Sequence, residues 1–227
     1  MGPLLFLIYI NDLPNISSKL SFFLFAEETN IYYESNNLIA LEKTTNKELK
    51  LLSLWLNLNR LALDVSKTNF VICRSPKKPV NHNEVWLMNR KAIDQKDHVK
   101  YLGVLMDQHL SWKYQISNVS KKISRGTGIL PKLKGNMNKE LLVNIHYCLV
   151  FSYLSYGVEA WGSACLSDLS KINVLQKKLL GLLRGTNTFK FSARPLVLFH
   201  PRIHFSKNLS FWTSMMFTNS VSLSLCI

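Results

Sequence analysis

The chain has 227 residues, with 28 Lys and Arg against 14 Asp and Glu, and a formal net charge of +14. Because 47% of its residues are hydrophobic and 11% are aromatic, the composition excludes a disordered tail and indicates a folded core. Its longest apolar runs are well short of the roughly 18 residues that a membrane-spanning helix needs, so we expect no membrane span.

The N-terminal part begins with a helical segment and a hairpin. Residues 3–13 are predicted to form a buried helix, because Pro3 suits a first helical turn and Pro14 ends the pattern. The aromatic-rich run 20–25 and the run 29–33 predict two strands that are joined by a tight acidic turn. Leucines at helical spacing then predict an amphipathic helix over residues 37–58.

Short strands follow this helix. Residues 70–73 and 98–106 each predict a strand, and residues 84–93 predict a hairpin that turns at Asn89-Arg90. The fold class expected for residues 1–107 is therefore α+β.

The character of the chain changes near Asp107. Residues 112–133, 139–161 and 167–184 all predict helices, so we expect a helical region over 108–185. In residues 186–227 serine becomes frequent and no helical or strand period persists, and we expect a poorly defined C-terminal tail.

The positive charge is concentrated in the second half. Residues 1–107 hold 13 basic and 11 acidic residues, whereas residues 108–227 hold 15 basic and 3 acidic ones. A basic surface of this kind is typical of proteins that bind a polyanion such as nucleic acid. A basic surface without a partner is the plain alternative, and an anionic membrane surface is a third interpretation.

The acidic turn is the main candidate for chemistry. Glu27 and Glu28 place two carboxylates side by side, and like charges at one point favour a bound cation. Pairs of Mg²⁺ ions catalyse phosphoryl transfer in polymerases. Two exposed glutamates on a turn are nevertheless commoner than a metal site, so the pair alone leaves both interpretations open.

Several separated segments together resemble the reverse transcriptase of non-LTR retrotransposons. They are GPLLFLIYINDLP at 2–14, FAEETNIYYES at 25–35, WLNLNRLALDVSKTNFV at 55–71, VKYLGVLMD at 99–107, SWKYQISNVSKKISRGTGIL at 111–130, YLSYGVEAWGSA at 153–164 and LQKKLLGLLRG at 175–185. The resemblance implies an RNA-directed DNA polymerase with a partial palm over residues 1–107 and a helical thumb-like region over 108–185.

The resemblance also implies roles by position. Glu27 and Glu28 occupy the places of the two aspartates in the F/Y-A-D-D motif of the family, which bind catalytic Mg²⁺. Lys67 matches a lysine that assists the departure of pyrophosphate. The implied contacts to the RNA template and DNA primer are the primer-holding hairpin Tyr101, Leu102 and Gly103, and the basic residues Lys121, Lys122, Arg125, Lys132, Lys134, Lys177, Lys178 and Arg184.

Two departures from the family pattern lead us to expect an inactive polymerase. Both motif aspartates are glutamates, and the chain starts inside a family motif, without the palm strand that carries a third metal-binding aspartate. The sheet is therefore expected to have an open edge, with marginal stability or aggregation as the consequence. A non-catalytic nucleic-acid-binding module and a non-functional retroelement relic are the alternatives.

The cysteines and the N-terminal residues indicate in which cellular compartment the protein is expected. Cys73, Cys148, Cys165 and Cys226 form no close pair, which predicts reduced thiols rather than a zinc site or a disulfide framework. Because no secretory signal is recognisable, we expect an intracellular protein of the nucleus or cytoplasm.

Overall fold

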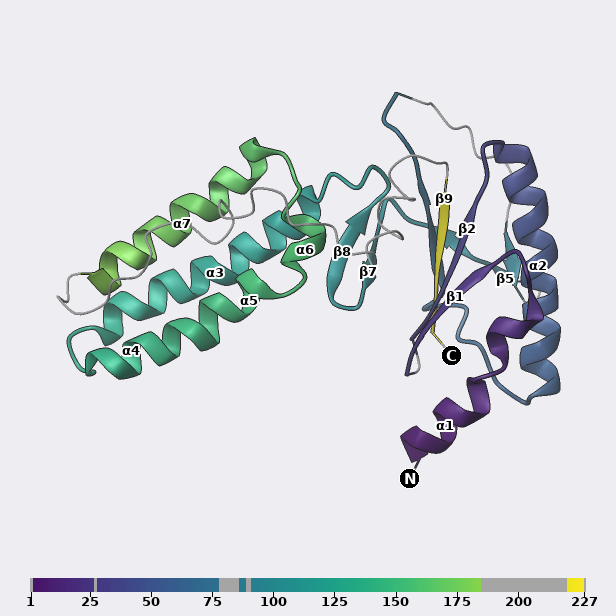
Figure 1. Ribbon diagram of the computed structural model, residues 1–227, viewed down its shortest axis with the longest axis horizontal. Helices are drawn as coiled ribbons and strands as arrows, with labels where there is room; N and C mark the ends of the chain where they lie inside the picture. The colour runs from purple at the N-terminus through teal and green to yellow at the C-terminus, as the bar shows by residue number, and fades with distance from the viewer. Residues whose placement is uncertain (1, 27, 78–85, 89–90, 185–219, 227) are drawn as a thin grey trace. The chain divides into compact units, whose positions relative to one another are not determined.

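The computed structural model describes residues 2–26, 28–77, 86–88, 91–184 and 220–226. The chain divides into two compact units (Figure 1). The first contains Met1–Leu110 together with Ser210–Ile227, and the second contains Ser111–Leu209.

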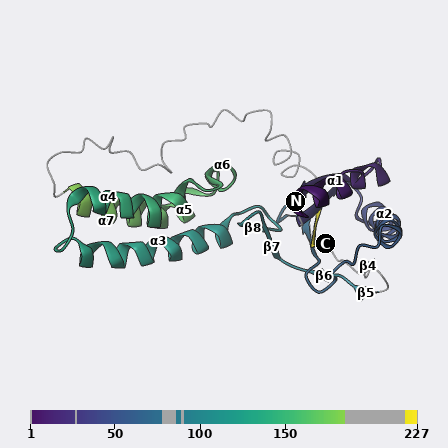
Figure 2. The same ribbon diagram turned by 90° about the horizontal axis from the view of Figure 1, so that it is seen from below.

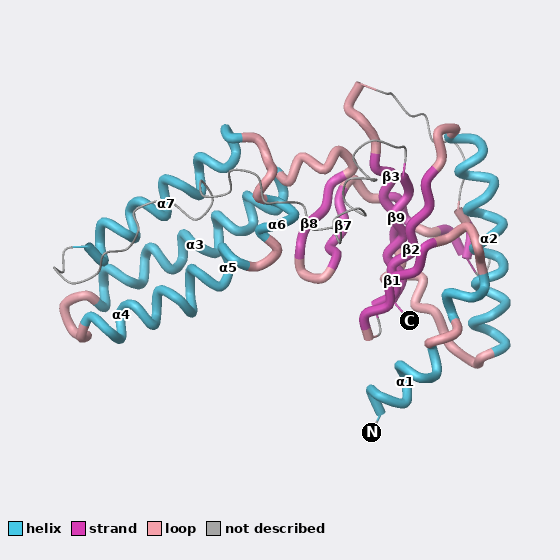
Figure 3. The backbone as a smooth tube through the Cα atoms, in the orientation of Figure 1, coloured by secondary structure: helices cyan, strands magenta, loops and turns pink. Residues whose placement is uncertain are grey.

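A five-stranded sheet forms the centre of the first unit, in the order β1-β2-β9-β3-β6 (Figure 3). Its strands are β1 (Ser21–Phe25), β2 (Glu28–Glu34), β9 (Ser220–Cys226), β3 (Asn69–Cys73) and β6 (Asp94–Gln95). The pairings are antiparallel except for that between β3 and β6, which is parallel. The predicted hairpin and the strand predicted at 70–73 are confirmed.

Helix α2 (Leu38–Leu58) packs against this sheet and confirms the helix predicted over 37–58. The Asn37 side chain caps its start by accepting a hydrogen bond from the Ile39 amide at 3.0 Å. The buried leucines of the helix share one hydrophobic core with the sheet. That core contains Leu41, Leu49, Leu52 and Leu56 from the helix and Ile31, Phe70 and Ile72 from the strands.

Helix α1 (Gly2–Ile10) forms where a helix is predicted, but the prediction that it is buried is wrong. Leu4 and Leu5 are each 61% exposed, and Ile8 is 67% exposed. A helix that is apolar all round needs cover on every side, whereas α1 reaches the core only through Ile10 and the partly buried Phe6. A 3₁₀ turn, Leu13–Ile16, follows it.

Two small hairpins complete the first unit. Strands β4 (Leu87–Met88) and β5 (Lys91–Ala92) confirm the predicted hairpin, and its turn at residues 89–90 lies outside the described residues. The single strand predicted over 98–106 is wrong, because β7 (His98–Tyr101) and β8 (Val104–Asp107) form a hairpin instead.

Strand β9 is the element that the sequence analysis missed. It pairs with β2 along its full length and with β3 over the five residues 220–224. The short alternation of serine with Val and Leu in SVSLSLC matches these neighbours, but it is too brief to stand out among many serines. The rest of the tail predicted over 186–227 lies outside the described residues.

The described part of the second unit, residues 111–184, is helical. Its elements are α3 (Lys113–Leu133), α4 (Lys139–His146), a π-helical turn (Tyr147–Phe151), α5 (Ser152–Ser155), α6 (Val158–Trp161) and α7 (Leu166–Arg184). Helix α3 packs against α7 and α4, and Figure 2 shows it running alongside the layer of α4, α5 and α7. The helices predicted over 112–133 and 167–184 are confirmed to within one residue.

The continuous helix predicted over 139–161 is wrong, because the helix ends at Ser155. Tyr156 is extended, and Gly157 follows with a φ of 63°, a left-handed conformation that glycine adopts without a steric penalty. The fully buried Trp161 fixes this break, since its indole Nε1 donates a hydrogen bond to the Tyr156 carbonyl at 3.0 Å.

The described chain is thus a mixture of helix and sheet, compatible with the expected α+β class. A search of the described residues for a helix long and apolar enough to cross a membrane found none.

Candidate functional site

The β1–β2 hairpin carries the predicted acidic pair. Phe25 pairs directly with Glu28, so the turn contains the two residues 26 and 27. Ala26 has a φ of 49°, as the first position of a tight two-residue hairpin turn requires. Glu27 itself lies outside the described residues. Glu28, at the start of β2, is half-buried.

The β7–β8 hairpin brings a second predicted group toward this turn. Its two-residue turn consists of Leu102, with a φ of 43°, and Gly103, with a φ of 82°. Burial raises the pKa of the Tyr101 hydroxyl, and the negative charge of Glu28 raises that pKa further. The neutral hydroxyl of Tyr101 therefore lies within electrostatic reach of the Glu28 carboxylate.

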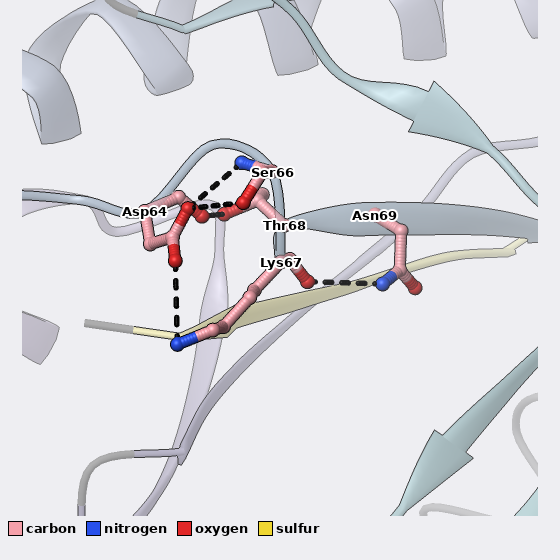
Figure 4. A network of polar contacts seen from close by, with 5 residues as sticks. All are labelled: Asp64, Ser66, Lys67, Thr68 and Asn69. Atoms are coloured by element: carbon pink, nitrogen blue, oxygen red, sulfur yellow. Dashed lines mark hydrogen bonds and ion pairs between the residues drawn. The ribbon is translucent and has the colours of Figure 1, made fainter.

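Lys67 lies in a tight turn just before β3 (Figure 4). Its ammonium Nζ forms an ion pair with Asp64 Oδ2 at 3.3 Å, and the Asp64 Oδ1 accepts hydrogen bonds from the Ser66 amide at 3.0 Å and the Ser66 hydroxyl at 2.5 Å. The hydrogen bond from the Ser66 hydroxyl is the main cause of the lowered pKa of Asp64. Because 70% of the Lys67 side chain is exposed, this ion pair is weak and leaves the ammonium accessible to an anion.

The Mg²⁺ implied by the resemblance would need several carboxylate ligands at the β1–β2 hairpin tip. In the described part of the hairpin tip these are limited to the carboxylate of Glu28. Among the residues that the structure describes, no group of three or more His, Cys, Asp or Glu side chains could hold a metal ion. The donors among the described residues do not fit a two-metal site.

Helix α3 carries a line of exposed cations. Lys121, Arg125 and Lys132 lie within about 40° of one another around the helix, given a turn of about 100° per residue. The buried residues Ile123 and Leu130 are on the opposite side of the helix. We call Lys121, Arg125 and Lys132 the α3 basic stripe; it is presented on the outer face of the second unit.

The other predicted cations are distributed around the same unit. Lys134 is exposed at the end of α3, and Lys177 and Lys178 are exposed on α7. Lys122 is half-buried, and its ammonium lies 4.8 Å from the centroid of the Tyr153 ring, which makes it a cation–π contact. The Arg184 side chain lies outside the described residues.

Sequence reasoning missed a set of hydrogen bonds that connects Arg74 to the residues after the β7–β8 hairpin. The Arg74 amide donates to the Gln108 carbonyl at 2.8 Å, and the Arg74 carbonyl lies 3.1 Å from His109 Nδ1. The His109 amide donates in turn to the buried Asp107 carboxylate at 3.3 Å. The two contacts of Arg74 join positions more than 30 residues apart, so no local pattern could have indicated them.

Comparison with curated proteins identifies polymerases of mobile elements. The chain is 25% identical over 199 residues to the probable RNA-directed DNA polymerase from transposon X-element of Drosophila melanogaster, covering 83% of this chain and 21% of that protein. It is 23% identical over 195 residues to the RNA-directed DNA polymerase from mobile element jockey of the same species, with 82% and 21% covered. The jockey polymerase of Drosophila funebris is 30% identical over 101 residues, 43% of this chain and 11% of that protein.

The chain spans about a fifth of the length of the first of these relatives. No family model matches the sequence, and no solved structure matches it either. Over most of its length, the chain is nonetheless similar to the RNA-directed DNA polymerases of Drosophila non-LTR retrotransposons, as its motifs predict.

Proposed function

We propose that this chain is the part of a reverse transcriptase that grips the template–primer duplex, and that it binds nucleic acid without polymerising it. The first unit would be a partial palm and the helical unit a thumb. The proposal rests on the similarity to RNA-directed DNA polymerases and on the charge of the helical region.

The α3 basic stripe carries this proposal. Three cations on the outer side of a single helix, spaced one or two turns apart, suit the regular phosphates of a duplex backbone. The exposed Lys134, Lys177 and Lys178 extend the positive surface of the unit. Contacts of this kind hold the duplex without reading its sequence, as a polymerase thumb requires.

The two hairpins of the first unit would receive the primer end. Tyr101, at the end of β7, and the turn residues Leu102 and Gly103 are those that the resemblance assigns to the primer, and Tyr101 lies within electrostatic reach of Glu28. A neutral tyrosine hydroxyl can donate a hydrogen bond to a sugar oxygen without adding charge. Without polymerisation there is no leaving pyrophosphate, and the exposed ammonium of Lys67 would instead be accessible to a phosphate of the bound nucleic acid.

The expected loss of catalysis follows from the glutamates at positions 27 and 28. Each adds one methylene to the aspartate of the family motif and moves its carboxylate by about one bond length. Mg²⁺ requires near-octahedral oxygen ligands at about 2.0–2.1 Å. A misplacement of about 1 Å can cost about 10²-fold in rate, and two such changes should compound.

Binding of a labelled RNA template–DNA primer duplex tests whether the exposed cations of the helical unit bind nucleic acid. With six exposed cations in phosphate contact, affinity should fall by about 10³-fold between about 50 and 200 mM salt. Duplexes of unrelated sequence should bind equally well. Affinity that stays flat across the salt series, or the absence of binding, would reject the proposal and favour a non-functional relic.

Primer extension on the same duplex tests the loss of catalysis. With nucleotides and either Mg²⁺ or Mn²⁺, incorporation should remain at the level of a no-protein control, because the motif carboxylates are displaced. A Glu27→Ala variant provides the matched control. Incorporation by the unmodified chain that this substitution abolishes would show that the glutamate motif is catalytic.

A further inference from the structure

Strand β9 joins two strands that do not pair with each other. In the described sheet, β2 and β3 each form hydrogen bonds to β9, which lies between them and runs antiparallel to both. The other four strands of the sheet come from residues 21–95, whereas β9 comes from Ser220–Cys226, beyond the helical unit. The sheet is therefore completed by a strand that is remote in sequence.

The space that β9 fills has the features of a peptide-binding slot. Adjacent strands lie about 4.8 Å apart, so without β9 the edges of β2 and β3 would face each other across about 9.6 Å. Each edge would present a row of unpaired N–H and C=O groups, which is a template for strand addition. Peptide-binding domains use a single such edge, whereas this slot offers two.

The pairing register explains which sequence the slot selects. Leu223 is opposite Ile31 of β2 and Phe70 of β3, and both partners belong to the hydrophobic core. The neighbouring position, Ser222, is opposite Tyr32 and Val71. A slip of one residue would place serine positions opposite Ile31 and Phe70 of that core and leucine positions opposite Tyr32 and Val71, which are also buried, so the pairing favours alternating aliphatic and small polar residues in one register.

We propose that the slot between β2 and β3 is a strand-acceptor site. Its resident ligand is the chain's own Ser220–Cys226 segment, and it accepts an extended peptide of the same sequence supplied separately. Backbone hydrogen bonds to β2 and to β3 provide the binding affinity. The alternation of aliphatic and serine residues in the peptide determines its register.

A disulfide across the slot tests the register in the full chain. Cys73 of β3 is directly opposite Ser220. Paired positions in an antiparallel sheet have Cα atoms about 4.5–5.5 Å apart, within the range of a disulfide. In a background with Cys148, Cys165 and Cys226 changed to serine, Ser220→Cys should form an intramolecular disulfide with Cys73. Oxidised glutathione takes up the two electrons and two protons of the thiols.

The matched control is Val221→Cys in the same background. Val221 is opposite Ile72 rather than Cys73, so it should give no crosslink on a non-reducing gel. Absence of the Ser220→Cys crosslink, or equal crosslinking by Val221→Cys, would overturn the assigned register and the proposal with it.

Capture of a peptide then tests whether an added strand can replace the chain's own Ser220–Cys226 segment between β2 and β3. A synthetic peptide of residues 219–227 with Ser220→Cys and Cys226→Ser is incubated with the full chain in the serine background and with oxidised glutathione, which takes up the two electrons and two protons of the thiols. Burial raises the pKa of the Cys73 thiol to about 12, so random thiol exchange is slow. We expect a peptide–Cys73 disulfide, detected as the added peptide mass.

A peptide that also carries Leu223→Pro is the control, because proline removes an amide donor from a strand that pairs on both sides. It should not be captured. Equal capture of both peptides would overturn selection by strand pairing. An intramolecular crosslink without capture of either peptide would show a fixed strand and overturn the acceptor site.

Discussion

Replacing Lys121, Arg125 and Lys132 with glutamine in one variant is expected to weaken duplex binding by about 10²- to 10³-fold at about 50 mM salt. The three cations form the α3 basic stripe, so the variant removes three of the proposed phosphate contacts from one surface. The slope of log affinity against log salt concentration is negative, and each lost contact reduces its magnitude by about 0.9. The magnitude should therefore decrease by about 2.7. Fluorescence anisotropy over a salt series measures both quantities.

Helix α2 offers a control with the same change of charge. Lys43, Lys47 and Lys50 are exposed, are spaced by one turn and lie in the first unit. Glutamine and lysine have similar helix propensities, so neither triple variant should unfold its helix. The α2 variant should leave the salt slope unchanged. Equal losses in the two variants would mean that binding follows net charge, and that the α3 basic stripe is not the site.

The long helices could be predicted because their information is local. In α2 the leucines recur at the helical period, and Leu41, Leu49, Leu52 and Leu56 are the residues that become buried. The same holds for α3, whose apolar positions face α7. Hydrophobicity without periodicity does not predict burial, as the exposed α1 shows. Burial also depends on which other elements are available to cover a helix.

The sheet could be predicted only in part because its pairing is long-range. The β1–β2 hairpin joins neighbouring segments and was found from its two short runs. The place of β9 depends on β2 and β3, whose residues lie about 150 or more positions earlier in the chain. A seven-residue alternation within a serine-rich stretch contains too little information to locate such a partner.

For the candidate site, the family pattern indicated the residues and the structure supplied their surroundings. Glu28 and Tyr101 are far apart in sequence, and their mutual approach depends on how two hairpins pack. The ion pair of Lys67 arises from the local turn that starts at Asp64. Lys122 was grouped with the other cations, but its contact with Tyr153 gives it a packing role as well.

Replacing Phe70 with alanine is expected to lower the free energy of unfolding of the first unit by about 3–5 kcal/mol. Phe70 is 1% exposed, and its ring stacks on Trp86 with the centroids 4.0 Å apart and the planes 18° apart. Alanine would leave a cavity and remove this aromatic contact, which is worth about 0.5–1.5 kcal/mol. Because small domains are stable by only about 5–15 kcal/mol, the loss would be a large fraction of the total.

Urea unfolding combined with hydrogen exchange of the β2 and β3 amides assigns the effect to this unit, because both strands belong to it. Phe70→Leu should cost less than about 1.5 kcal/mol, because it keeps most of the volume. Phe25→Ala is the exposed control on the same sheet and should cost less than about 0.5 kcal/mol. If Phe70→Ala and Phe25→Ala had equal effects, Phe70 would not be a core residue. A large effect with faster exchange in both β2 and β3 would show that the core beneath β9 holds the two halves of the sheet together.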